Sequence, residues 1–199
     1  MKEHTRNSNK KKRIIDDYNS SAHFYDRRYR QIQLEKYDLI LKDYHLNGKI
    51  ISDIGCGTGL LFEYISNLKK DERRIKYKYV AIDISWNMLL EFKSKVINYK
   101  PKNNLELILG DIENLPFRGN AFHSILSLTS FQNLPCLKKG LRESFKVCKN
   151  NADFRFSILK KNIDLKVLKD MLKLKIKDQF IINEKELEDF VIIGKLSND

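Results

Sequence analysis

A glycine-rich turn directly after a short apolar run constrains the fold of this chain more than any other feature. The apolar run at residues 49–54 leads into the segment DIGCGTG at 53–59. Glycines at alternate positions allow the backbone to turn tightly and to approach a ligand without an intervening Cβ atom. A helix is expected at residues 60–68, and the N-terminus of a helix presents free N–H groups. The pattern therefore predicts a buried strand, a ligand-binding turn and a helix.

Short apolar runs alternate with segments of helical spacing along the rest of the chain. Strands are expected at 77–84, 105–109, 122–128, 154–159, 176–182 and 190–196. Helices are expected at 18–45, with Ser20 or Ser21 as the N-cap, and at 85–96, 137–148 and 165–174. This alternation is typical of a parallel sheet with helices on both faces. We therefore expect an α/β, Rossmann-like fold.

The 199 residues suffice for one domain, and the basic charge is concentrated in two segments. Residues 1–13 carry six bases and one acid without periodicity, so we expect a disordered basic tail followed by a single domain at 14–199. Residues 136–177 carry 13 bases and four acids, within a net charge of +12. A polyanionic partner such as RNA is one interpretation. The other is compositional, because the chain is rich in Lys, Asn and Ile together, as AT-rich coding would give.

Cysteine and histidine usage indicates the compartment and argues against a metal site. Cys56, Cys136 and Cys148 are three in number and lack CxxC spacing, which favours a reducing cytosol over a disulfide framework. The four histidines do not cluster, so no metal site is expected. No stretch approaches the roughly 20 apolar residues of a membrane span. We expect a cytoplasmic protein without a membrane partner.

Three carboxylates each lie at the end of a predicted strand or just after it. Asp53 lies inside the glycine turn, where it would repel a diphosphate but suits a ligand with an ammonium group. The glycine spacing also departs from the dinucleotide fingerprint, since the third glycine follows the second by two residues. Asp83 can accept both ribose hydroxyls of a nucleoside or cap the next helix. Asp111 could hydrogen-bond an adenine edge.

Four blocks together resemble the class I S-adenosylmethionine-dependent methyltransferases of the type 11 group. They are DIGCGTG (53–59), AIDIS followed by Met88-Leu89 (81–89), GDIENLPF (110–117) and SILSLTSFQNLP (124–135). The resemblance implies a seven-stranded, mostly parallel sheet with the last strand antiparallel, and S-adenosyl-L-methionine as the cofactor. It also implies a set of cofactor-binding residues, namely Tyr25, Asp53, Gly55, Gly57, Gly59, Asp83, Ile84, Asp111, Ile112 and Thr129.

The resemblance implies a role for each part of this set. Asp53 and the glycines would line the methionine part, Asp83 would hold the ribose, and Asp111 with Ile112 would flank the adenine. Thr129 would lie near the sulfonium, and Tyr25 would close over the cofactor.

The segment after the fourth predicted strand supplies the candidates for substrate contact. The ring of Phe131 could stack on a base and the amide of Gln132 could read its edge. Alternatively, Phe131 packs the loop. Cys136 is expected to pack rather than to act as a nucleophile. No general base is evident, which favours in-line transfer by positioning.

A finer resemblance concerns the acceptor. Residues 25–41 and the later blocks resemble the small-subunit ribosomal RNA guanine-N7 methyltransferases, which implies RNA as the substrate and a small zinc-binding activator subunit as a partner. Two alternatives remain, a small-molecule methyltransferase of the type 11 group and a non-catalytic cofactor-binding subunit. Charge is the sequence feature that separates the first alternative from the RNA enzyme.

Overall fold

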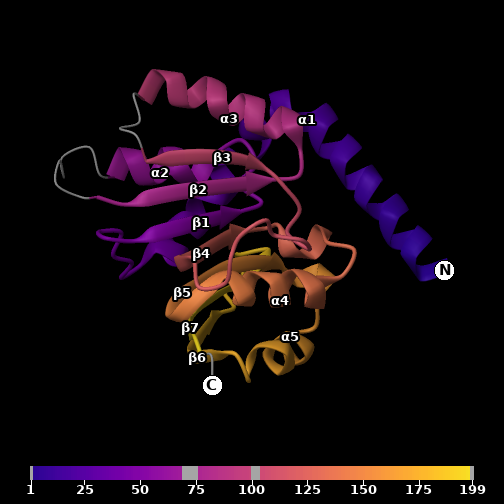
Figure 1. The fold of residues 1–199 in the computed structure, drawn as a ribbon, viewed down its shortest axis with the longest axis vertical. Coiled ribbons are helices and arrows are strands. Elements are labelled where there is room, and N and C mark those ends of the chain that lie inside the picture. The colour runs from indigo at the N-terminus through magenta and orange to yellow at the C-terminus, as the bar shows by residue number, and fades with distance from the viewer. Residues whose placement is uncertain (1, 69–75, 100–103, 198–199) are drawn as a thin grey trace.

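The computed structural model describes residues 2–68, 76–99 and 104–197, in which helices lie on both sides of a central sheet (Figure 1). The helices are α1 (Lys2–Leu41), α2 (Leu60–Leu68), α3 (Trp86–Tyr99), α4 (Leu137–Val147) and α5 (Leu165–Leu172), with short 3-10 turns at Phe131–Asn133 and Lys160–Asn162. The strands are β1 (Ile50–Ile54), β2 (Lys78–Asp83), β3 (Leu105–Leu109), β4 (Phe122–Leu128), β5 (Cys148–Leu159), β6 (Ile176–Ile182) and β7 (Asp189–Leu196).

The seven strands form one sheet in the order β3-β2-β1-β4-β5-β7-β6. Strands β1 to β5 pair in parallel, whereas β7 is antiparallel to both β5 and β6. The expected seven-stranded, mostly parallel sheet with its last strand antiparallel is therefore confirmed. Since β1 and β4 are neighbours and the strand order reverses there, the sheet has its crevice at the carboxyl ends of β1 and β4.

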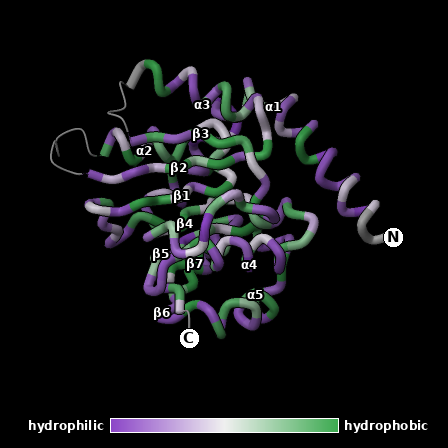
Figure 2. The backbone as a smooth tube through the Cα atoms, in the orientation of Figure 1, coloured by the Kyte–Doolittle hydropathy of each residue, from purple (hydrophilic) through white to green (hydrophobic). Residues whose placement is uncertain are grey.

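Alternate residues of the central strands contribute to two hydrophobic layers, one on each face of the sheet. Ile51 and Tyr79 pack with the helices α2 and α3, and Ile54 and Ile125 pack with α4 and α5. Green, hydrophobic stretches mark parts of the central strands in Figure 2. Strands buried on both faces read as apolar runs rather than as alternating patterns, which is why they were detectable in the sequence.

Most expected elements agree with the observed ones within a few residues. The start of β5 differs, because the strand was expected from residue 154 and begins at Cys148. The preceding helix was expected to reach residue 148, but α4 ends at Val147, and Asn150 and Asn151 lie inside the strand. Asn151 has φ of +58°, a left-handed conformation that Asn tolerates and that fits the register shift between β4 and β5.

The N-terminal segment is where the structure corrects the sequence prediction most. Residues 2–13 were expected to be a disordered tail, yet they form the first turns of α1, which runs unbroken to Leu41. Ser20 and Ser21 therefore do not cap a helix, and their hydroxyls donate to the Asp17 carbonyl within it. The first part of α1 runs past the right-hand end of the sheet in Figure 1. Lys10 and Lys11 contact the loops at that end of the sheet. These contacts explain why a segment whose polar sequence predicted disorder is helical.

Across the described residues, none of the helices combines the length and apolar character needed to cross a bilayer. The described residues also contain no group of three or more His, Cys, Asp or Glu side chains arranged to hold a metal ion.

Candidate functional site

A cavity opens at the carboxyl ends of the parallel strands and is roofed by α1. Eight of the ten residues expected to bind a cofactor line it, and they come from five separate segments of the chain: Tyr25, Gly55, Gly57, Asp83, Ile84, Asp111, Ile112 and Thr129. The other two, Asp53 and Gly59, do not line it. The fold thus brings residues of all four sequence blocks and of α1 to one place.

The three glycines of the turn are needed for different structural reasons. Gly57 has φ of +54°, and a Cβ atom there would meet nothing within 4 Å, so the backbone borders open space. A Cβ on Gly55 would lie 2.2 Å from the Ser130 Oγ, and one on Gly59 would lie 2.3 Å from the Phe92 ring. Gly57 alone of these three keeps space open for a ligand, whereas the other two allow close packing of the protein on itself.

The backbone N–H groups of the turn are largely engaged within the protein. Gly55 and Cys56 donate to the Ile82 carbonyl, and Gly59 donates to the Cys56 carbonyl. Gly57 donates to Asp83 Oδ2 at 2.8 Å. The turn is therefore held by its own chain before any ligand arrives.

Asp53 is buried below the turn rather than on the cavity wall. Its Oδ2 accepts a hydrogen bond from the Tyr79 hydroxyl at 2.7 Å, and the side chain borders a second, smaller cavity beside the first. Burial raises the pKa of Asp53 to about 7, against the opposing effect of the Tyr79 hydrogen bond, and the charge of Asp83 adds to the rise. Binding of a cation next to it would favour the ionised form.

Asp83 at the end of β2 supports the start of the next helix and also borders the cavity. Its Oδ1 accepts from the Ser85 N–H at 2.9 Å, so it helps to hold the start of α3. It also lines the cavity, and the carboxylate can still accept from a ligand hydroxyl, because its two oxygens offer about four lone pairs to the backbone donors of Ser85, Gly57 and Ile84. Burial raises its pKa, and hydrogen bonds from the backbone of Ser85, Gly57 and Ile84 oppose the shift.

Asp111 is engaged by a residue that the sequence prediction had assigned to a free tail. The Lys11 Nζ lies 2.6 Å from Asp111 Oδ2 and 2.7 Å from Glu113 Oε2. Burial alone would raise the pKa of Asp111, but hydrogen bonds from Lys11, from the Glu113 N–H and from Asn114 lower it. The carboxylate is therefore ionised and borders the cavity with Lys11 beside it.

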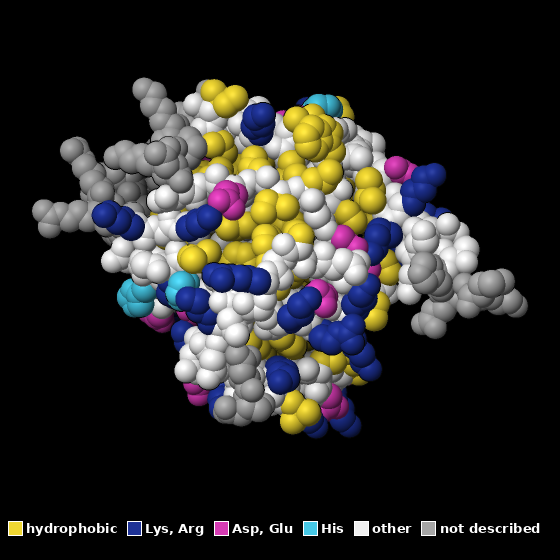
Figure 3. Space-filling model, viewed as in Figure 1, with side chains coloured by type: hydrophobic (Ala, Val, Ile, Leu, Met, Phe, Trp, Pro, Cys, Tyr) yellow, Lys and Arg dark blue, Asp and Glu magenta, His cyan; other side chains and the backbone are white. Residues whose placement is uncertain are grey.

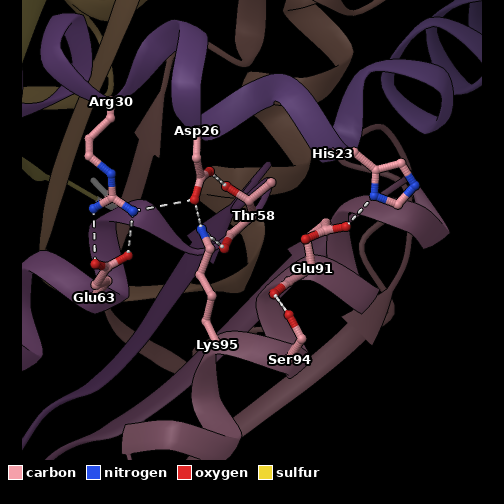
Figure 4. A network of polar contacts seen from close by, with 8 residues as sticks. All are labelled: His23, Asp26, Arg30, Thr58, Glu63, Glu91, Ser94 and Lys95. Atoms are coloured by element: carbon pink, nitrogen blue, oxygen red, sulfur yellow. Dashed lines mark hydrogen bonds and ion pairs between the residues drawn. The ribbon is translucent and has the colours of Figure 1, made fainter.

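Polar contacts clamp α1 over the glycine turn (Figure 4). Asp26 accepts from the Thr58 hydroxyl at 2.5 Å and forms an ion pair with Lys95 of α3. Arg30 donates to both carboxylate oxygens of Glu63 on α2, at 2.9 and 3.1 Å. The roof of the cavity is thus fixed to the turn and to the two helices that follow it.

A family model described as a methyltransferase domain matches residues 52–156, which is more than half of the chain. The chain belongs to this family. The match runs from β1 into β5 and so includes the glycine turn and all three carboxylates. The domain has the class I methyltransferase fold, and S-adenosyl-L-methionine is the cofactor of that class.

One relative and two solved structures illustrate the similarity. A ubiquinone/menaquinone biosynthesis C-methyltransferase of Rickettsia prowazekii is 30% identical over 144 residues, covering 71% of this chain and 56% of that protein. The structure of magnesium protoporphyrin IX methyltransferase from Synechocystis with bound S-adenosylmethionine is 16% identical at a TM-score of 0.74, covering 95% and 97% of the two chains. A methyltransferase of Haloferax volcanii in complex with the Trm112 activator is 12% identical at a TM-score of 0.69, covering 91% and 98%.

The chain spans little more than half the length of the first curated relatives that it matches. None of the three proteins just described is named as a ribosomal RNA methyltransferase. The finer resemblance to the guanine-N7 enzymes therefore remains a prediction.

In this methyltransferase domain, Thr129 follows β4 in a left-handed conformation with φ of +53°, which is unusual for a β-branched residue. Its hydroxyl points to a buried pair, accepting from Lys36 Nζ at 2.9 Å and donating to Asp189 Oδ2 at 3.0 Å. Its N–H lies 3.0 Å from the Ser157 hydroxyl oxygen. These contacts hold a strained backbone in place at the cavity wall.

The two candidates for substrate contact lie off the cavity of the domain. Phe131 is fully buried between Phe154 and Phe156, with ring centroids at 6.4 and 5.3 Å, so it packs the loop, the alternative that the sequence left open. The amide of Gln132 turns back to donate to the Thr129 carbonyl, and Gln132 does not line the cavity. Neither contacts the cavity in this structure, because the short 3-10 turn folds this segment onto β5.

Several residues on the cavity wall were not singled out from the sequence. They are Lys11, Ile14, Tyr18, Met88, Leu128, Ser130, Asn133, Leu134 and Pro135. Met88, Leu128, Ser130 and the segment 133–135 lie inside the recognised blocks, so their position was a usable signal. Lys11, Ile14 and Tyr18 lie on one face of α1, as their helical spacing requires. The polar residues around them made this spacing hard to recognise in the sequence.

Proposed function

We propose that this chain is the catalytic domain of an S-adenosylmethionine-dependent methyltransferase that acts on a small, largely apolar molecule. The observation that carries the proposal is the convergence of Gly57, Asp83 and Asp111 on one cavity at the crevice of a sheet of this class. Open parallel sheets bind their ligands at this place.

The donor and acceptor groups present fit the proposed cofactor. The open backbone at Gly57 leaves room for close approach, and the carboxylate of Asp83 suits a pair of ribose hydroxyls. Ile84 and Ile112 supply apolar surface beside Asp111, which suits the flat adenine ring. Asp53 lies on the far side of the turn, near the second cavity, where a positive charge would be favoured.

When bound, the cofactor supplies a sulfonium with a transferable methyl group. The chain's own contribution would be to orient the acceptor and exclude water, which can supply several kcal/mol of the barrier. Burial raises the pKa of the Tyr18 hydroxyl to about 12, with Asp83 adding to the shift, so Tyr18 stays protonated. Among the described residues that line the cavity, no histidine is present, which favours an acceptor atom that needs little help in losing a proton.

The acceptor side of the cavity supports an apolar substrate. Ile14, Tyr18 and Tyr25 of α1 face Leu134 and Pro135 across it. An apolar wall with a few polar groups is typical of a site for a small organic ligand. The C-methyltransferase of Rickettsia prowazekii, which acts in ubiquinone and menaquinone biosynthesis by name, agrees with such a substrate.

RNA remains the competing substrate. Lys10 donates to the Leu134 carbonyl and Lys11 pairs with Asp111 and Glu113, so two of the bases expected to hold phosphates are used within the protein. Lys and Arg side chains are nevertheless spread over the part of the surface near α4 and α5 (Figure 3). Methyl transfer to RNA that weakens steeply with salt would favour this alternative over the proposal.

Two measurements test the proposal. Calorimetry should detect binding of S-adenosylhomocysteine to the wild type and a loss of binding in Asp83→Ala, because the ribose hydroxyls lose their acceptor. Labelled S-adenosylmethionine should then transfer its methyl group to the organic extract of a cell lysate rather than to the RNA or protein fraction. Absence of binding by the wild type would contradict the cofactor, and label in RNA would contradict the substrate class.

A small zinc-binding activator subunit is the partner that we further propose to test. The methyltransferase of Haloferax volcanii is named in complex with the Trm112 activator, and it shares the fold of this chain. Co-expression with an activator of that type should raise the yield of folded chain if the partnership exists. An unchanged yield and melting temperature would argue that the domain works alone.

A further inference from the structure

Gln33 on the inner face of α1 carries a buried polar atom that the protein does not satisfy. Its side chain is 5% exposed, and its Oε1 has no hydrogen-bond partner among the described residues. The same amide group interacts with the hydroxyl of Tyr25, about two turns earlier on the helix. Leaving a buried acceptor unpaired costs free energy, so such an atom calls for a partner that is not part of the chain.

Gln33, which carries the unpaired oxygen, lines a small cavity next to the main one. Tyr25, Gly55 and Gly57 line both cavities, so the two are adjacent, and Gln33, Tyr37 and Asp53 line the small one only. Its volume is about 30 Å³. That exceeds what one water needs and suits a group of ammonium size.

The chemistry of this small cavity favours a cation. Asp53 and Gln33 Oε1 are both acceptors. The N–H groups of Gly55, Cys56 and Gly57, which could have served an anion, already donate to Ile82 and Asp83. Acceptors are therefore in excess, and a group with several N–H donors would satisfy them.

We propose that Gln33 Oε1 accepts a hydrogen bond from the ammonium group of the cofactor's amino-acid end, which makes Gln33 a specificity-determining residue for the intact amino acid. The inference rests on the proposed function, since it takes the main cavity as the nucleoside site. It adds that the roof helix itself contributes a ligand to the amino-acid end of the cofactor.

Truncated ligands separate this role from a merely structural one. S-adenosylhomocysteine carries the ammonium and the carboxylate, decarboxylated S-adenosylmethionine keeps the ammonium alone, and methylthioadenosine lacks both. Calorimetry with the Gln33→Met variant should show a loss of about tenfold in affinity for the first two ligands and no change for methylthioadenosine. Because the three ligands are compared on one protein, partial unfolding would affect all of them alike.

The neighbouring Gln31 offers a matched control, since it is the same residue type on the same helix and is exposed. Gln31→Met should bind all three ligands as the wild type does. Gln33→Glu keeps an acceptor oxygen at the same reach and should keep the preference for the ammonium-bearing ligands, which tests the proposal even if Gln33→Met does not fold.

Three outcomes would overturn the inference. Equal losses for all three ligands would make Gln33 structural, and unchanged affinities would remove it from the site. A loss confined to S-adenosylhomocysteine would assign Gln33 to the carboxylate instead. If the wild type binds none of the three, the proposed function fails rather than this inference.

Discussion

The ammonium group of Lys36 lies 3.0 Å from the Asp189 carboxylate, and the two side chains are 2% and 0% exposed. The pair joins α1 to β7, and both side chains form hydrogen bonds with the Thr129 hydroxyl. Lys36→Met alone would leave the Asp189 charge buried without its counter-ion. We expect it to lower the free energy of unfolding by about 3–5 kcal/mol, and the double variant Lys36→Met, Asp189→Leu to lose less than the single one.

Urea unfolding of both variants checks this expectation, and the Lys195 to Asp153 pair supplies the control. Lys195 is 45% exposed and lies 2.8 Å from Asp153, so Lys195→Met should cost under about 1 kcal/mol. A Lys36→Met variant as stable as Lys195→Met would show that the buried pair contributes little.

Asp53 should make stability depend on pH in a defined direction. Its pKa is about 7 in the folded protein, above the ordinary value of 3.8, so the native state holds this proton more tightly than the unfolded state. The contribution to stability is fully present below the ordinary value and is lost as the pH rises through about 7. Asp53→Asn should therefore gain stability relative to the wild type from pH 4 to pH 8. Parallel unfolding curves for both proteins at all pH values would refute the assignment.

Gly57 and Gly59 should respond differently to alanine. A methyl group on Gly59 would run into the Phe92 ring at a φ of +80°, so we expect Gly59→Ala to cost about 2–4 kcal/mol of stability. A methyl group on Gly57 would enter open space at a φ of +54°, so Gly57→Ala should cost about 1 kcal/mol. Its larger effect should be on the affinity for S-adenosylhomocysteine. Thermal melts and calorimetry on both variants separate the two cases, and a reversed order of stabilities would contradict the packing described here.

Lys11 should matter for stability only where Asp111 is ionised. The lowered pKa of Asp111 means that the contact stabilises the protein above the ordinary carboxyl value and that this contribution is lost as the pH falls through the folded one. Lys11→Met should cost roughly 1 kcal/mol at pH 7 and less below pH 4. Lys12→Met, at an exposed position one residue on, is the matched control and should change nothing at either pH. Equal losses for the two variants would argue that helix propensity rather than the ion pair is measured.

The fold was largely predictable because the hydrophobic pattern of the sequence marks the central strands. β3, β4 and β6 match the expected ranges, since each is a short apolar run bounded by polar or turn-forming residues. The N-terminal helix was only half predictable. Its first turns bury almost nothing, and their order depends on contacts that Lys10 and Lys11 make with loops about 100 residues away.

The site was predictable where a strand end fixes a residue and unpredictable where tertiary packing decides. Asp83 and Asp111 follow strands directly, so the topology alone brings them together. Phe131 could face either way, and the aromatic pair Phe154 and Phe156 on the next strand decides that it is buried. Gln33 and Lys36 lie outside the four recognised blocks, and nothing local marks their partners.

The bond between Lys36 and Asp189 links positions 153 residues apart, from the roof helix to the last strand of the sheet. During synthesis, all residues that line the cavity are added to the chain before Asp189, the counter-ion of Lys36 in the roof helix. A growing chain that stops short of β7 would carry Lys36 next to Thr129 without its counter-ion, and α1 would still be held by its contacts with the glycine turn, α2 and α3. The buried lysine of the roof helix therefore gains its counter-ion only when β7 has been added to the sheet.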